Sequence, residues 1–200
     1  MDALTEVDSL VIQQRKEWGE ILTGFETKNK YAVMNAAGDQ LYYAAEVGGN
    51  FLVRMFLKAW RPFEIAIVRP DNQMVLRLKS PFRFYFRELH IFNPSGQMLG
   101  RLQRRFTLLR RRYSVYDAQG NELLELFGPL LHPWTFEIRQ DEKILGKITK
   151  KWSGLLKEGF TDADNFGVTF PADWPKEAKA VLLGAVFLID FVHFENKNNN

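Results

Sequence analysis

Twelve residues near the C-terminus carry oxygen ligands at a spacing known from calcium loops. In the stretch Asp162-Ala-Asp164-Asn165-Phe166-Gly167, carboxylates fill positions 1 and 3 and glycine fills position 6, with Asp173 at position 12. This is the outline of an EF-hand loop. The outline is incomplete, because position 5 is Phe166, which has no side-chain oxygen, and position 12 is Asp rather than the longer Glu. The residues therefore predict weak calcium binding at best, in the high-micromolar to millimolar range.

The same residues also have a purely structural interpretation. Asp162 and Asp164 can accept hydrogen bonds from the backbone of their own turns. Gly167 permits a positive φ, and Asp173 can cap a helix that has Pro175 in its first turn. Calcium ligation and local turn chemistry are both open interpretations of this stretch.

A second group of residues forms a basic segment that contains no acid, Arg101 to Arg112. Its centre is apolar, Phe106-Thr-Leu108-Leu109, and arginines flank it on both sides. Such a segment can insert its apolar tip into a membrane while each basic residue contributes about 1 kcal/mol near anionic headgroups. The alternative is a hairpin with a solvated basic face and a packed tip. The predicted lipid-binding residues are Arg101, Arg104, Arg105, Phe106, Leu108, Arg110, Arg111 and Arg112.

Composition argues against several other kinds of chemistry. The chain has no cysteine, which excludes disulfides, thiolate metal sites and S-acylation. The histidines, His90, His132 and His193, lie far apart in sequence, and we interpret His90 and His193 as packed core residues. A net charge of only +3 and the lack of a nucleic-acid motif disfavour nucleic acid as the partner of the arginines. No catalytic residue is predicted, so an activity on lipids would consist of movement without bond making.

The middle of the chain repeats one pattern, in which apolar alternation leads into a turn and then resumes. The turns are rich in Asn, Asp, Gly and Pro, which predicts β-hairpins. Closure into an antiparallel barrel of about twelve strands would protect the edges of such a sheet. We expect one domain over residues 1–195, with residues 1–22 as an N-terminal arm of strand and helix packed on it and residues 196–200 as a disordered tail. The five predicted hairpins cover residues 31–46, 63–79, 89–103, 113–128 and 136–150.

The segment from Ala178 to Phe194 is apolar and rich in helix formers. Its charge-free run, Ala180–Ile189, has ten residues and spans about 15 Å as a helix, half of a ~30 Å hydrocarbon core. Apolar residues cover every face of this helix, which is typical of a helix at the centre of a core. We therefore predict a buried helix starting near Lys176, with a single C-terminal membrane span as the alternative. The predicted core residues of this helix are Val181, Leu182, Val186 and Ile189.

Two neighbouring segments, GKITKKWSGLLKEGFTDADNFGVTFP (146–171) and KAVLLGAVFLIDF (179–191), resemble the phospholipid scramblase family. The resemblance extends in order through residues 22–31, 43–46, 61–63 and 128–129. It implies a tubby-like fold, a closed antiparallel barrel around a hydrophobic C-terminal helix. It also implies calcium-triggered, ATP-independent movement of phospholipids between leaflets. By this resemblance, the calcium segment falls on Asp162, Asp164, Phe166, Phe170 and Asp173.

These observations lead to an expected function with stated alternatives. We expect a scramblase-family protein that binds anionic phospholipid membranes and moves phospholipids across them, with calcium as a weak cofactor. The alternatives are a soluble tubby-like module that binds anionic lipids, including phosphoinositides, without transport, and a nucleic-acid or protein adaptor. The expected location is the cytoplasm or the cytoplasmic face of a membrane. Acyl anchoring is excluded, since the cysteine clusters of the animal members are absent.

Overall fold

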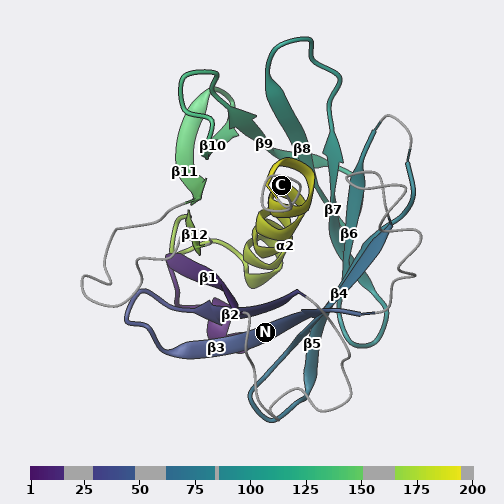
Figure 1. Cartoon of the computed structure of the whole chain (residues 1–200), viewed down its shortest axis with the longest axis vertical. Helices are drawn as coiled ribbons and strands as arrows, with labels where there is room; N and C mark the ends of the chain where they lie inside the picture. Colours follow the sequence, from purple (N-terminus) through teal and green to yellow (C-terminus); the bar gives the residue numbers. More distant parts are fainter. Residues whose placement is uncertain (16–28, 48–61, 84–85, 151–164, 195–200) are drawn as a thin grey trace.

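Twelve antiparallel strands close into a barrel around one long helix (Figure 1). The computed structural model describes residues 1–15, 29–47, 62–83, 86–150 and 165–194. Each strand pairs with its neighbours in sequence, and β1 pairs with both β2 and β12 to close the ring. The predicted fold, a closed barrel of about twelve strands around a C-terminal helix, is confirmed. The elements are η1 (Asp2–Leu4), β1 (Ser9–Arg15), β2 (Lys30–Met34), β3 (Gln40–Glu46), β4 (Phe63–Val68), β5 (Met74–Ser80), β6 (Glu88–Phe92), β7 (Met98–Arg104), β8 (Arg111–Asp117), β9 (Glu122–Gly128), β10 (Thr135–Gln140), β11 (Lys143–Lys150), β12 (Asn165–Thr169) and α2 (Lys176–His193).

Three of the hairpin turns at one end of the barrel share a common construction. In the turn between β2 and β3, Asn35 Oδ1 accepts hydrogen bonds from the backbone N–H groups of Ala37 and Asp39, at 3.0 and 2.8 Å. The N–H of Gly38 donates to the carbonyl of Asn35, and Gly38 has a φ of 89°. A type I turn followed by a left-handed residue connects antiparallel strands without splaying them, and glycine takes that conformation without strain. Residues 93–97 and 117–121 repeat this arrangement.

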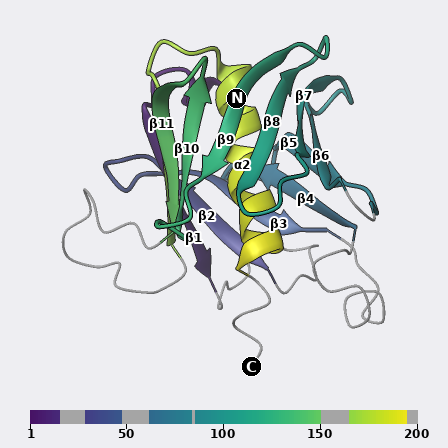
Figure 2. The ribbon, with the colours of Figure 1, turned by 90° about the horizontal axis from the view of Figure 1, so that it is seen from above.

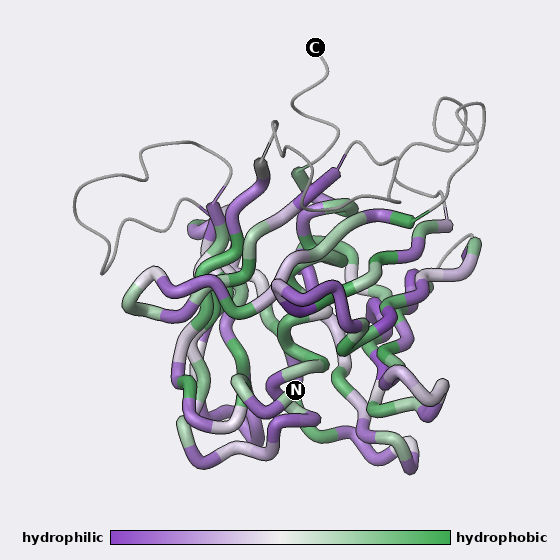
Figure 3. Tube along the Cα trace, turned by 90° about the horizontal axis from the view of Figure 1, so that it is seen from below, coloured by the Kyte–Doolittle hydropathy of each residue, from purple (hydrophilic) through white to green (hydrophobic). Residues whose placement is uncertain are grey.

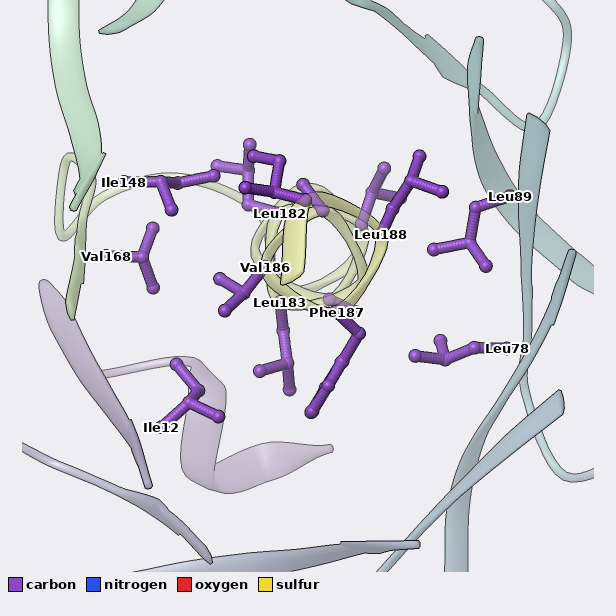
Figure 4. Packing of buried hydrophobic residues seen from close by; sticks show 14 of the residues in the cluster. Ile12, Leu78, Leu89, Ile148, Val168, Leu182, Leu183, Val186, Phe187 and Leu188 are labelled. Atoms are coloured by element: carbon purple, nitrogen blue, oxygen red, sulfur yellow. The ribbon is translucent and has the colours of Figure 1, made fainter. Parts of the chain in front are cut away.

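The helix α2 lies along the axis of the barrel and forms the centre of its core. Side chains from opposite walls of the barrel point at it from all around (Figure 4). Phe191 stacks on Phe63 of β4 with ring centroids 4.4 Å apart, and Phe187 meets the ring of Tyr31 edge-on. The four helix residues predicted to be buried are at most 1% exposed: Val181, Leu182, Val186 and Ile189.

The two buried charged residues of α2, Lys179 and Asp190, have polar partners at opposite ends of the helix. Near its start, Lys179 Nζ donates to the carbonyl oxygens of Thr5, Val7 and Ala172, at 2.9, 2.8 and 2.7 Å. Burial lowers the pKa of the Lys179 ammonium below its ordinary value. Because the carbonyls come from the N-terminal segment and from the approach to α2, this lysine fastens both to the helix.

Near the end of α2, the carboxylate of Asp190 is also engaged. Tyr31 donates its hydroxyl to Asp190 Oδ2 at 2.9 Å, and Lys150 Nζ lies 3.8 Å from Asp190 Oδ1. The charges that interrupt the apolar run therefore belong inside the barrel, where they have polar partners. Neither helix of the described part is long and apolar enough to cross a bilayer, so the alternative of a C-terminal span finds no support.

Two local predictions around α2 and β12 are wrong. The N-cap of α2 is Pro175 and not Asp173, and no side chain caps the helix. Gly167 does not have a positive φ, because it lies in β12, opposite Val11 of β1 and Thr149 of β11. Sequence favoured a compact turn here, whereas pairing with two neighbouring strands holds the backbone extended.

Candidate functional site

The connection between β7 and β8 places three large apolar side chains in solvent. Its base is closed by the backbone N–H of Arg105, which donates to the carbonyl of Arg112 at 2.9 Å. Beyond this bond Phe106 is 79% exposed, Leu108 87% and Leu109 72%. The tip of this connection, residues 106–109, is therefore unpacked, in contrast to the alternative of a packed hairpin. We call residues 105–110 the arginine loop.

Two of the surrounding arginines are engaged by acids on the outer wall of the barrel. Arg105 pairs with Glu122 and lies 3.5 Å from Glu125, and its Nε donates to Ser114 Oγ. Arg112 Nε lies 3.3 Å from the same Glu125. These two guanidinium groups are directed along β8 and β9, where acids neutralise their charge.

Arg111 has a structural role between two connections. Its Nη1 donates to the carbonyl of Pro133 at 2.6 Å, and its Nη2 lies 3.4 Å from the carbonyls of Pro129 and His132. Its guanidinium also covers the ring of Phe136 at 4.5 Å. Burial lowers the pKa of this arginine. Arg111 thus ties the arginine loop to the connection between β9 and β10.

The remaining arginines of the predicted set differ in their availability. Arg101 lies on the outer wall, with its guanidinium 4.1 Å above the ring of Tyr116 and an Nη1 bond to Gln103. Arg104 and Arg110 are exposed and flank the apolar tip. Among the described residues, no acid forms an ion pair with Arg104, Arg110 or Arg111. Arg104, at the end of β7, and Arg110, in the arginine loop, are therefore the charges most open to an external anion.

A second exposed apolar connection lies beside the arginine loop, and the sequence prediction missed it. Residues 129–134 join β9 to β10, and within them Leu130 is 61% and Leu131 89% exposed. Trp134 of the same connection is partly exposed and stacks on Phe194, at the end of α2. The signal in the sequence was a pair of leucines between prolines, PLLHPW, in the connection between two predicted hairpins.

The residues of the calcium prediction are only partly described. Asp162 and Asp164 lie outside the described residues. Phe166 and Phe170 have buried side chains, and Asp173 is exposed. Phe166 belongs to β12, and Phe170 and Asp173 follow this strand, whose five residues extend over about 13 Å. In the described part, the middle of the predicted loop is thus an extended strand.

The described residues contain no group of three or more His, Cys, Asp or Glu side chains that could hold a metal. His193 is half-buried and its Nε2 lies 2.8 Å from the hydroxyl of Tyr113. His90 is not a core residue, because the alternation of β6 turns it outward, where its Nε2 lies 3.1 Å from Glu88 Oε2. Tyr113 is fully buried, so its hydroxyl beside His193 is a contact within the core and not a nucleophile that a substrate could reach.

The barrel around a helix defines the structural class of this protein. A solved structure of an Arabidopsis thaliana protein superposes with a TM-score of 0.51, covering 93% of this chain and 94% of that one. The two sequences are 9% identical, so the comparison concerns the fold alone.

The sequence comparisons identify the family within that class. The Scramblase family model matches residues 1–196, and the chain belongs to this family. Phospholipid scramblase 1 of Rattus norvegicus is 35% identical over 100% of this chain, and that of Homo sapiens is 36% identical over 98%. Phospholipid scramblase 2 of Bos taurus is 35% identical over 98% of this chain. The chain spans 63%, 66% and 71% of the length of these three relatives.

Proposed function

We propose that this chain binds anionic phospholipid membranes and moves phospholipids between their leaflets. The observation that carries the binding is the exposed apolar tip of the arginine loop, flanked by Arg104 and Arg110 without acid partners among the described ion pairs. The relatives named phospholipid scramblase supply the class of lipid and the movement. No covalent step is needed, because the task is to lower the cost of carrying a headgroup through hydrocarbon.

The two parts of the loop contribute to binding in different ways. Burial of the apolar tip in the acyl region gains about 25 cal/mol for each Å² removed from water, and this gain does not depend on salt. Each arginine near an anionic surface adds about 1 kcal/mol, which weakens as salt shortens the Debye length from about 10 Å at 0.1 M to about 3 Å at 1 M. Arg104 and Arg110 together should therefore contribute about 2 kcal/mol, or roughly thirtyfold in affinity.

Vesicle flotation with matched variants tests this assignment. On vesicles containing phosphatidylserine, Arg104→Gln with Arg110→Gln should lose about thirtyfold in affinity at low salt and much less at high salt. The control removes the same charge at the opposite end of the barrel, Arg69→Gln with Lys143→Gln, and should bind as the wild type does. Equal losses in both pairs would mean that net charge, and not this loop, governs binding.

The apolar tip has its own test, which also separates lipid from nucleic acid. Phe106→Ser with Leu108→Ser should weaken vesicle binding by an amount that salt does not change. A surface for nucleic acid would lose affinity with the arginines but would be insensitive to the tip. If vesicle binding is unchanged in the tip variant and in the arginine variant, the arginine loop is an ordinary solvated connection.

Lipid movement requires a separate measurement, since binding alone does not imply it. The helix α2 is occupied as the core of the barrel, so we place lipid movement at the contact between the protein and the bilayer. In vesicles with a fluorescent phospholipid in both leaflets, an impermeant reductant bleaches only the outer leaflet unless lipids exchange. If the protein moves lipids, the reductant should bleach the whole signal. If the protein floats with the vesicles but only half of the signal is bleached, the protein binds membranes without moving lipids.

We also propose that any calcium response is weak and depends on the carboxylates before β12. Asp173 lies beyond the far end of the strand, so it is poorly placed to share one ion with residues that precede Asn165. With a Kd of ~1 mM and 1 mM ion, the gain in stability is about 0.4 kcal/mol. Titration calorimetry of Asp164→Ala and Asp173→Ala tests this. Micromolar affinity in the wild type, or loss of binding only in Asp173→Ala, would contradict the proposal.

A further inference from the structure

Large apolar side chains are exposed on three connections at the same end of the barrel. The arginine loop lies between residues 129–134 on one side and the connection from β5 to β6 on the other. In the latter, Phe82 and Phe86 are nearly half exposed, and Pro81, Arg83 and Arg87 accompany them. These connections, together with the C-terminal end of α2, face the same side of the molecule (Figure 2). We call this set of residues, 81–83, 86–87, 105–110 and 129–134, the apolar end.

Direct contacts hold the three connections side by side. The backbone N–H of Arg104 donates to the carbonyl of Arg87 at 2.8 Å, which joins the arginine loop to the connection from β5 to β6. On the other side, Arg111 bonds to the carbonyls of Pro129 and Pro133. The apolar side chains of the three connections therefore form one surface, and the barrel fixes the positions of these connections relative to one another.

The five hairpin turns at the opposite end of the barrel have the reverse chemistry. These turns, residues 35–39, 69–73, 93–97, 117–121 and 141–142, contain no large apolar residue. They contain one base, Arg69, and five acids: Asp39, Asp71, Asp117, Asp141 and Glu142. The apolar end contains no acid at all and is bordered by Arg104 and Arg111. In Figure 3 the turns away from the C-terminus run largely in purple and pale colours.

We propose that the whole apolar end docks on the anionic bilayer, with the C-terminal end of α2 toward the lipid and the five acidic turns away from it. This inference rests on the proposed membrane binding and adds the surface and the orientation. An apolar patch with Arg104 and Arg110, which have no acid partner among the described residues, complements an anionic membrane, which attracts cations and accepts apolar side chains. The acids at the other end are repelled by the same surface, so the two ends favour one orientation together.

Contact through three connections has a consequence that contact through one loop lacks. A single inserted loop leaves the barrel free to tilt about that loop. Three connections held together by backbone and arginine hydrogen bonds define a plane. The barrel axis should therefore lie close to the membrane normal. The leucines of residues 129–134 and the phenylalanines of the connection from β5 to β6 should then enter the interface as Leu108 does.

The absence of cysteine makes this orientation directly measurable in the full chain. Single variants Phe86→Cys, Leu108→Cys and Leu131→Cys probe the three connections, and Ala37→Cys and Gln119→Cys probe exposed turns at the other end. Each is labelled with an environment-sensitive fluorophore and mixed with vesicles of phosphatidylcholine, with and without phosphatidylserine. We expect a blue shift and quenching by spin-labelled lipid at positions 86, 108 and 131, and neither at positions 37 and 119.

The outcomes separate this inference from the function on which it rests. If the unlabelled chain does not float with anionic vesicles, both fail. If it floats but only position 108 responds, the single loop binds and the docking plane is wrong; a response at position 37 or 119 reverses the orientation. A blue shift without vesicles that grows with protein concentration would assign the apolar end to self-association and overturn the inference.

A pair of matched variants checks the contribution of the second connection without labels. Leu130→Ser with Leu131→Ser should weaken vesicle binding by about tenfold or more, since two exposed apolar side chains no longer enter the interface. The control, Met74→Ser with Ile144→Ser, removes exposed apolar side chains at the opposite end and should bind as the wild type does. Equal binding by both variants, with normal melting, would overturn the role of residues 129–134.

Discussion

Gly100 of β7 is the position at which the barrel wall comes very close to the helix in its centre. A Cβ at this position would lie 2.5 Å from the carbonyl oxygen of Tyr116 and 2.7 Å from Cγ2 of Val181. Both distances are shorter than van der Waals contact, and the first partner is backbone that cannot rotate away. Gly100→Ala should therefore separate β7 from β8 and from α2.

The expected loss of stability can be estimated from two opposing effects. Overpacking a well-packed core costs about 1–3 kcal/mol. Alanine instead of glycine also restricts the unfolded chain, which would favour folding by about 0.4–1 kcal/mol where the native site has room. Because the clash involves backbone, we expect a net loss of about 1–2 kcal/mol. In a domain of this size that corresponds to a lowering of Tm by about 2–8 °C.

Thermal and urea unfolding of Gly100→Ala measure this effect. Gly184→Ala is the matched control within α2, since its Cβ would meet only side-chain carbons of Ile91 and Leu89, at 3.1–3.5 Å. These atoms can shift, so this variant should lose less stability than Gly100→Ala. A Tm of Gly100→Ala equal to or above that of the wild type would refute the close packing of α2 on β7, and with it the helix as the core of the barrel.

Three further predictions concern buried groups. Leu183→Asp places an unpaired charge in the core and should abolish cooperative unfolding; a soluble variant with normal melting contradicts this. Burial raises the pKa of the Tyr113 hydroxyl to about 12, above its ordinary value of 10.0, so the free energy of unfolding falls by roughly 3 kcal/mol as pH rises through this range. Urea unfolding of Tyr113→Phe should show a smaller alkaline loss. Lys179→Met leaves buried carbonyls without a donor and should cost about 2–5 kcal/mol, against less than about 1 for the exposed Lys176→Met; equal losses would contradict the role of Lys179.

The sequence by itself determined the hairpins, the strand content and the helix. Period-2 alternation and the turn residues at Asn35–Gly38 and Asn93–Gly96 are local signals, because a hairpin pairs residues that are close in the chain. The apolar run around Leu183 was too short to span a bilayer and apolar on every face, and both properties belong to the segment alone. The apolar stretch Phe106–Leu109 between arginines was also recognisable in the sequence, but the sequence did not show that its side chains are exposed.

The tertiary structure decided which of the patterned residues are available for binding. Six arginines looked equivalent in sequence, but Arg105 and Arg112 meet acids of β9 and Arg111 meets carbonyls beyond β9. Such contacts join residues on different strands, and no local rule predicts them before the register of the sheet is known. For the same reason, the pairing of β5 to β10 in sequence order brings residues 81–83, 86–87 and 129–134 beside the arginine loop. The chemistry of this end therefore depends on which strand ends lie next to one another.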